Sequence, residues 1–88
     1  AYVTRDTGTF AGKVRITTTG VVGIGITTPN ARAILDATST TKGFLPPRMT
    51  TAQRDAIATV AGDAGLTIFN TTTTKLEVWD GAAWQQAW

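Results

Sequence analysis

Residues 66–80, which read LTIFNTTTTKLEVWD, decide the fold class of this 88-residue chain. Leu66–Asn70 and Lys75–Asp80 each alternate apolar and polar side chains, which is the period of a half-buried strand. Thr71–Thr74 forms the tip between them, and Asp80-Gly81 is a turn dipeptide. The stretch therefore predicts a β-hairpin. We expect one face to carry Leu66, Ile68, Leu76 and Val78, and the other to carry Thr67, Phe69, Glu77 and Trp79.

The composition around this hairpin also favours strands. The chain contains 19 threonines, which are β-branched and fit a pleated surface. It has no cysteine and no histidine, which excludes a Ser-His-Asp triad, a zinc finger and a disulfide framework. We therefore expect a β-rich module that is not an enzyme and has no catalytic, metal or cofactor-binding residues.

The charge pattern gives no sign of nucleic-acid or membrane partners. The net charge is +2, and the basic residues are spread along the chain instead of forming a patch. The longest apolar stretch, Val21–Ile26, is too short to span a bilayer. The glycines just before and within this stretch have the order Gly20, Gly23, Gly25, which does not match a dinucleotide-binding fingerprint. We expect no nucleic-acid binding and no membrane insertion.

Chain length suggests association between copies. Folding would bury roughly 8,500 Å², which contributes about 130 kcal/mol once the apolar share is counted. Ordering the chain at ~1.5 kcal/mol per residue opposes folding by about the same amount. The free energy of folding of a single copy is therefore close to zero, and we expect oligomerisation to provide the missing stability.

The N-terminal part predicts further strands. Lys13–Thr18 alternates, and Tyr2–Thr4 is a short candidate strand. In the stretch 22–26 we expect Val22, Ile24 and Ile26 on one face, with glycines on the other that let a backbone approach closely. Residues 31–37 fit either a short strand or a helical turn. Residues 43–47 are expected to be extended because of two prolines, with Phe44 and Leu45 as anchors.

One helix is predicted after the prolines. Thr50 and Gln53 fit a capping box, and an apolar stripe continues through Ala52, Ala56, Ile57, Val60 and Ala61. Gly62 is expected to end this helix, and Arg54, Asp55 and Thr59 are expected to face water. The last residues, 82–88, form either a third strand or a loose tail.

Three segments resemble phage tail fibres and related virion appendage proteins. Residues 22–32 (VGIGITTPNAR) are similar to their VGIGTTxPxAKLxV segments, and residues 42–57 (KGFLPPRMTTAQRDAI) match a long segment that follows in the same proteins. Residues 65–84 are similar to their GLLIYNTTTNKLxxYDGTAW ending. The chain departs from the pattern at 33–37, which is two residues longer.

This resemblance implies a mainly β, elongated, intertwined homotrimer with one short α-helix and a C-terminal hairpin. It also implies a structural role in a virion appendage (a tail fibre, baseplate or collar fibre) that contributes to host attachment, with other virion proteins as partners. We expect a β-rich stem at 1–41 and, at 42–88, the Pro-Pro segment, helix and hairpin, in one continuous module. Candidate residues for the trimer interface are Val22, Ile24, Ile26, Phe44, Leu45, Ile57, Ile68, Trp79 and Trp84.

The alternative function is a module that binds a host glycan or receptor. Trp79, Asp80, Trp84 and Trp88 lie close together in the sequence, and aromatic rings beside carboxylates can hold sugars. Packing of Trp79 and Trp84 within the hairpin or between subunits is favoured over glycan contact.

Charged residues have a structural explanation as well. For Arg48 and Arg54 we favour salt bridges between subunits, with Asp36, Asp55, Asp63 or Asp80, over contact with an anion or a receptor. Glu77 and Asp80 are expected on opposite faces of their strand, which does not suit a glycosidase carboxylate pair.

Overall fold

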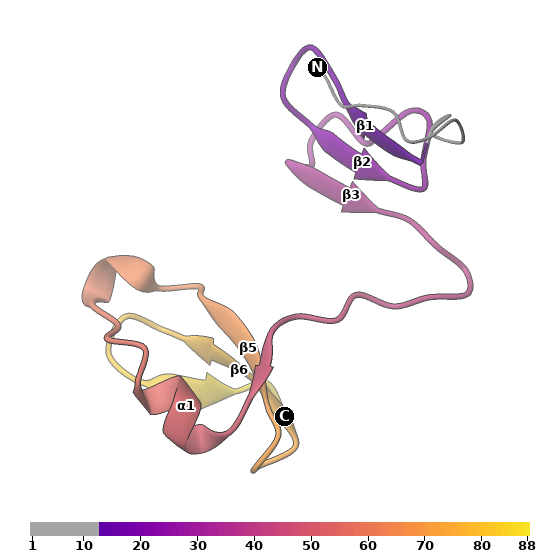
Figure 1. Ribbon diagram of the computed structural model, residues 1–88. Coiled ribbons are helices and arrows are strands. Elements are labelled where there is room, and N and C mark those ends of the chain that lie inside the picture. Colours follow the sequence, from indigo (N-terminus) through magenta and orange to yellow (C-terminus); the bar gives the residue numbers. More distant parts are fainter. Residues whose placement is uncertain (1–12) are drawn as a thin grey trace. The chain divides into compact units, whose positions relative to one another are not determined.

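The computed structural model describes residues 13–88, so the predicted strand at Tyr2–Thr4 lies outside the described part. The described chain is mainly β with one short α-helix, which confirms the predicted fold class. It divides into two compact units between Phe44 and Leu45 (Figure 1). The elements are β1 (Val14–Ile16), β2 (Val22–Ile24), β3 (Leu35–Ala37), β4 (Arg48–Met49), α1 (Thr51–Asp55), the 3-10 helix η1 (Ala61–Asp63), β5 (Thr67–Asn70), β6 (Lys75–Trp79) and β7 (Trp84–Gln86).

The N-terminal unit contains a three-stranded sheet in the order β1-β2-β3. β1 and β2 are antiparallel, with Val14 opposite Ile24 and Ile16 opposite Val22. A tight turn joins them, in which the Val21 amide donates to the Thr17 hydroxyl at 3.1 Å. β3 lies parallel to β2. Residues 31–37, for which the sequence fitted either a short strand or a helical turn, therefore end in a strand.

The two glycines of the β2 region serve contacts within the chain. A side chain on Gly23 would clash with the ring of Pro29, which therefore packs directly on the strand backbone. Gly25 has a φ of +76° and lies against the carbonyl of Thr38. Because Gly25 takes this left-handed conformation, the alternation stops there. Ile26 consequently lies beside Gly23, and the prediction that it shares a face with Val22 and Ile24 is wrong.

A carboxylate fixes the loop that leads into β3. Asp36 accepts hydrogen bonds from the Asn30 amide at 2.9 Å and the Thr38 hydroxyl at 2.8 Å. These bonds, that from the Asn30 amide first, hold the pKa of Asp36 below its usual value. Asp36 thus holds the chain on both sides of β3, while backbone pairing with β2 gives the strand its register.

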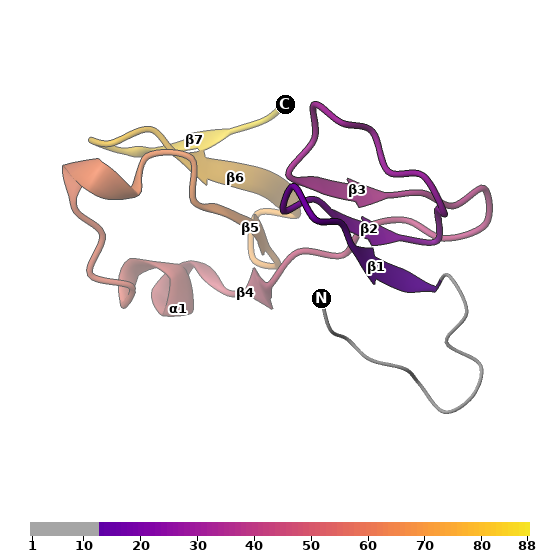
Figure 2. The ribbon, with the colours of Figure 1, turned by 90° about the horizontal axis from the view of Figure 1, so that it is seen from above.

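The C-terminal unit contains a four-stranded sheet in the order β4-β5-β6-β7 (Figure 2). β4 and β5 are parallel, whereas β5, β6 and β7 form an antiparallel meander. The strand β7 resolves the alternative left open for residues 82–88. Thr74, at the end of the tip between β5 and β6, has a φ of +57°.

The predicted faces of this hairpin are wrong by one residue. Asn70 pairs with Lys75, so Ile68 lies opposite Glu77 and Phe69 lies opposite Leu76. Partners across a ladder share a face. Ile68 and Glu77 therefore lie on one face, and Phe69, Leu76 and Val78 lie on the other.

The helix α1 begins as predicted but ends early. Thr50 and Gln53 form the capping box, with hydrogen bonds of 3.2 Å and 2.9 Å. The helix ends at Asp55, so the predictions that it continues to Ala61 and that Gly62 ends it are wrong. The following residues include β-branched Ile57, which loses rotamer freedom in a helix. Val60 is held extended, because its carbonyl accepts from the Trp79 indole at 3.0 Å.

Candidate functional site

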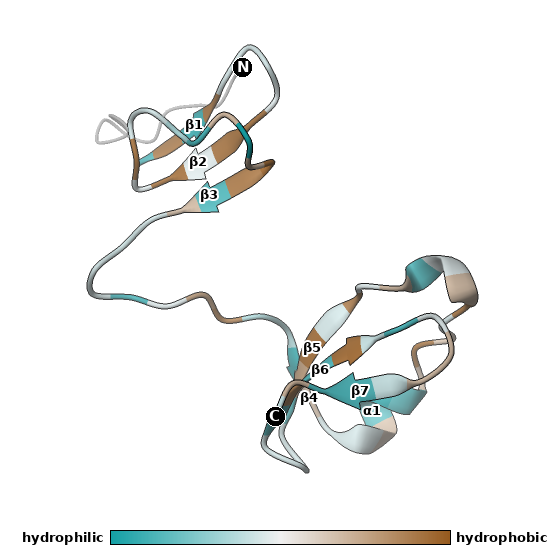
Figure 3. Cartoon of the chain, turned by 180° about the vertical axis from the view of Figure 1, so that it is seen from behind, coloured by the Kyte–Doolittle hydropathy of each residue, from teal (hydrophilic) through white to brown (hydrophobic). Residues whose placement is uncertain are grey.

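One face of the β1-β2-β3 sheet is entirely apolar, and we call it the N-terminal apolar face. The strand register places on it Val14, Ile16, Val22, Ile24, Leu35 and Ala37. The large side chains among them are mostly exposed: Val14 at 38%, Ile16 at 40%, Ile24 at 45% and Leu35 at 49%. In Figure 3 these strands alternate along their length between hydrophobic ends and a less hydrophobic middle. Such a surface suits contact with another apolar surface better than contact with water.

The reverse of this sheet has a different character. It carries Arg15, Gly23 and Asp36, and Pro29 covers part of it. Of the predicted interface residues, Val22 and Ile24 thus belong to the N-terminal apolar face and Ile26 does not. The alternation in the first strand pointed to Val14 and Ile16 as well, but β3 could not be added because its pairing partner was unknown.

Phe44 and Leu45 lie before the two prolines in a segment that is neither helix nor strand. Their exposed fractions are 74% and 65%. Ile57 is half-buried beyond α1, whereas Ile68 is 2% exposed in the centre of the C-terminal sheet. Ile68 therefore serves the interior of its own unit.

The interior of the C-terminal unit is built around charged and polar side chains, which we call the polar core. Glu77 is 1% exposed, and one of its oxygens accepts from Arg54 at 2.7 Å and from Asn70 at 3.1 Å. Its second oxygen accepts from the Thr73 hydroxyl at 2.9 Å. The buried Asn70 also donates to the Thr51 hydroxyl at 2.9 Å. These bonds tie α1 to the hairpin.

The electrostatics of the polar core favour the ionised pair. Burial raises the pKa of Glu77, but the hydrogen bonds from Arg54, Asn70 and Thr73 outweigh it and leave the pKa below its usual value. The bond to Glu77 raises the pKa of Arg54 in turn. Glu77 is thus a buried structural anion, not an accessible acid for catalysis.

This cluster corrects two expectations about Arg54. Its side chain is 17% exposed instead of facing water. Its carboxylate partners are Glu77 and Asp55 of the same chain, so the favoured salt bridge between subunits is replaced by an ion pair inside the unit. The sequence feature that could have revealed this ion pair is the length of the Thr71–Thr74 tip. Four tip residues place Asn70 opposite Lys75, and therefore Ile68 opposite Glu77. Arg48 is exposed on β4.

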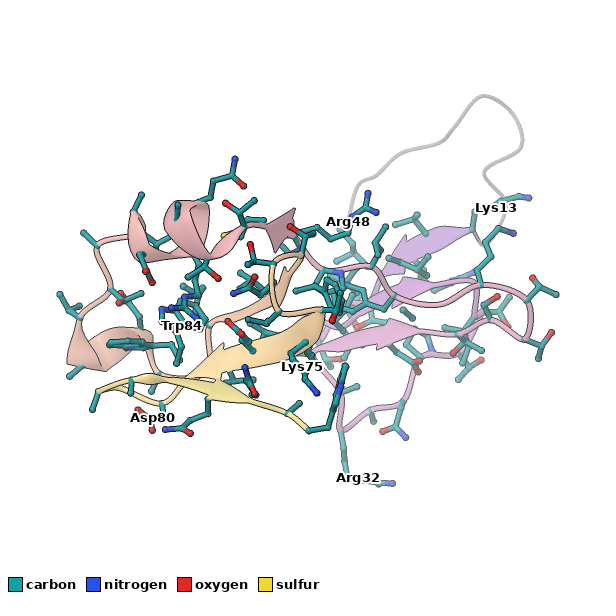
Figure 4. The ribbon with its side chains drawn as sticks, turned by 90° about the horizontal axis from the view of Figure 1, so that it is seen from below. Lys13, Arg32, Arg48, Lys75, Asp80 and Trp84 are labelled. Carbon is teal, nitrogen blue, oxygen red and sulfur yellow. The ribbon has the colours of Figure 1, made fainter. Side chains whose placement is uncertain are left out.

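The structure brings two of the predicted glycan residues together. Trp79 and Trp84 are cross-strand partners whose rings meet edge to face at a centroid distance of 5.6 Å. The Arg54 guanidinium lies 5.5 Å from the Trp84 ring centroid. Figure 4 shows Trp84 on the side of the sheet where α1 lies. The two rings are therefore occupied by packing within the unit.

Asp80 and Trp88 have other surroundings. The Asp80 carboxylate accepts from the amides of Ala82 and Ala83, each at 2.8 Å, and from the Gln85 side chain at 2.8 Å. These bonds, the backbone ones first, lower its pKa. Trp88 is 64% exposed, with the Lys75 ammonium 5.8 Å from its ring centroid.

Residues 13–88 contain neither a cluster of metal-ligating side chains nor a membrane-spanning helix. No three acidic side chains come close enough there to share a metal ion. No helix in this part of the chain has the length and apolar character needed to cross a bilayer.

The comparison with known families gives one match. The sequence model of a family described as "Phage tail like trimerisation region" matches residues 23–88. No curated protein and no solved structure matches the chain significantly.

Proposed function

The chain belongs to the phage tail-like trimerisation region family, and from this premise we propose that it is a trimer-forming segment of a tail fibre or another virion appendage. It would act by assembly, hold three chains together and so contribute to host attachment. Other virion proteins would be its partners. The family description refers to trimerisation and names no enzymatic activity.

The observation that supports this proposal most strongly is the imbalance between buried and exposed apolar residues. Among the residues described, Val21 and Ile68 are the only buried apolar side chains. In this described part, ten large apolar side chains are exposed, four of them on the N-terminal apolar face. A single copy with so small an apolar core lacks the main favourable term in folding, and association with further copies supplies it.

The division of the chain supports different roles for its two parts. Within residues 1–41, the proposed stem, the described sheet has little interior of its own and gains most from association. Residues 42–88 contain the polar core, which satisfies its own hydrogen bonds. We assign the stem to contact between copies and the second part to a stable, less dependent unit.

Binding of a glycan is the less favoured function. The Trp79 indole already donates to Val60, and Arg54 covers a face of Trp84. Trp88 is the one exposed aromatic ring of the predicted set. A receptor site built on Trp88 alone lacks the converging polar groups that specificity requires.

The molar mass of the purified chain tests the proposal. Light scattering after gel filtration should give about three times the chain mass of 9.3 kDa. A monomer that unfolds cooperatively at the same concentration would contradict the proposed function. A glycan array tests the alternative: binding by the parent that is lost in Trp88→Ala, with the trimer mass unchanged, would favour a receptor-binding module.

A further inference from the structure

We propose that the N-terminal apolar face is the surface through which three copies of the chain meet around a common axis. This inference rests on the proposed trimerisation function and names the contact that produces it. The occupant of the face is the same face of two further copies.

The composition of the face is the first argument. All six side chains that the register places on it are apolar, and none of them carries a charge or a hydrogen-bonding group. The reverse face carries Arg15 and Asp36, and Pro29 packs on Gly23 there. Of the two faces of this sheet, only the apolar one can exclude water without leaving a polar side chain unpaired.

The distribution of exposed apolar residues is the second argument. Every strand of the N-terminal sheet contributes at least one exposed large apolar side chain: Val14 and Ile16 in β1, Ile24 in β2 and Leu35 in β3. Within residues 45–88 the exposed large apolar side chains lie outside the strands. The N-terminal sheet is therefore the one whose strands need a partner surface.

The size of the sheet fits closure by three copies. Three strands about 4.8 Å apart give a sheet about 14 Å wide. With the strands along the axis, three such sheets forming a triangle would each lie about 4 Å from the axis, close to half the ~10 Å at which two sheets pack. Side chains can fill this space. β2 is the central strand, so Val22 and Ile24 would lie nearest the axis.

The experiment uses the absence of native cysteine, because one introduced thiol is then unique. Val22→Cys and Ile24→Cys place a thiol on the central strand of the apolar face. Arg15→Cys, on the reverse face of β1, is the matched control. The molar mass of each full-length variant is first measured by light scattering, and the variant is then treated with a short bismaleimide reagent. Two variants on the face guard against a local packing failure at one position.

We expect Val22→Cys and Ile24→Cys to cross-link rapidly into pairs. The yield should reach a limit of about two thirds of the chains, because a two-armed reagent joins two members of a trimer and leaves the third single. Arg15→Cys should remain unlinked. This inference is overturned if the parent is a trimer but neither Val22→Cys nor Ile24→Cys cross-links, or if Arg15→Cys cross-links instead. Either result would still be compatible with trimerisation. A monomeric parent would overturn trimerisation itself.

Discussion

Replacing Arg54 by methionine should destabilise the protein, because the buried Glu77 carboxylate then has no cationic partner. Arg54 donates to Glu77 at 2.7 Å, and Glu77 is 1% exposed. Removing one partner of a buried ion pair costs about 3–5 kcal/mol, because the other charge stays buried without compensation. The Arg54 side chain retains 17% exposure, so some water can enter and the lower end applies. We expect a loss of about 3 kcal/mol, or about a hundredfold in the folding equilibrium.

The assay is urea unfolding followed by tryptophan fluorescence. All variants are compared at one chain concentration, because association makes apparent stability depend on concentration. Arg48→Met removes the same charge from an exposed position on β4 and should change the free energy of unfolding by about 0.5 kcal/mol or less. Adding Glu77→Gln to Arg54→Met should recover most of the loss, because the amide has no charge to bury: its oxygen can accept from Asn70, and its NH2 can donate to the Thr73 hydroxyl.

The loss should also depend on pH. In the parent the pKa of Glu77 lies below its ordinary value of 4.5, so its stabilising contribution is present above that pH and disappears as pH falls through the lowered pKa. In Arg54→Met, burial dominates and raises this pKa above 4.5, so protonation at low pH relieves the penalty. The difference in the free energy of unfolding between parent and variant should therefore narrow as pH falls from the raised pKa of the variant, above 4.5, to the lowered pKa of the parent. A loss no larger than that of Arg48→Met, or a gap that does not change with pH, would refute the role of the polar core.

Three further predictions follow from local contacts. Gly23→Ala should lower the free energy of unfolding by about 1–3 kcal/mol, because the added Cβ would clash with the Pro29 ring. Adding Pro29→Ala should restore part of this free energy, and thermal unfolding measures both variants. A Gly23→Ala variant as stable as the parent would contradict the close approach of Pro29 to the strand. Thr50→Ala should cost about 1 kcal/mol by removing the cap on Gln53, with urea unfolding as the measurement and an unchanged midpoint as the contrary result. The Asp80 carboxylate should titrate below its usual 3.8 in carbon-13 NMR, and a value at or above 3.8 would show that its three hydrogen bonds are absent in solution.

The features predicted correctly from the sequence depend on local chemistry. The capping box needs only Thr50 and Gln53, three residues apart, and the hairpin needs two alternating strands with a threonine-rich tip. Both were therefore visible in short windows. The extent of α1 was not: the helix ends at Asp55, and the chain that follows it is held at Val60, whose carbonyl accepts from the distant Trp79 indole. A contact across 19 residues leaves no trace in the periodicity of the helix.

The candidate surfaces show the same division between local and distant information. Alternation identified Val22 and Ile24, but Ile26 was misassigned because Gly25 adopts a left-handed conformation that only tertiary contacts require. Charge patterns suggested partners for Arg54 in other subunits, whereas the hairpin register brings Glu77 to it in the same chain. A shift of one residue moves every side chain to the opposite face, so the error in register hid the polar core.

The meander of β5, β6 and β7 has a consequence for the order of folding. Each of its strands pairs with the next one along the chain, so these contacts close over short loops. Short loop closure favours rapid folding, whereas any step that requires several chains slows as the chains are diluted. We therefore expect the C-terminal meander to form first in each chain, independently of concentration, and the N-terminal sheet to wait for encounter between copies. Of these two sheets, the one synthesised later would then be the one that folds first.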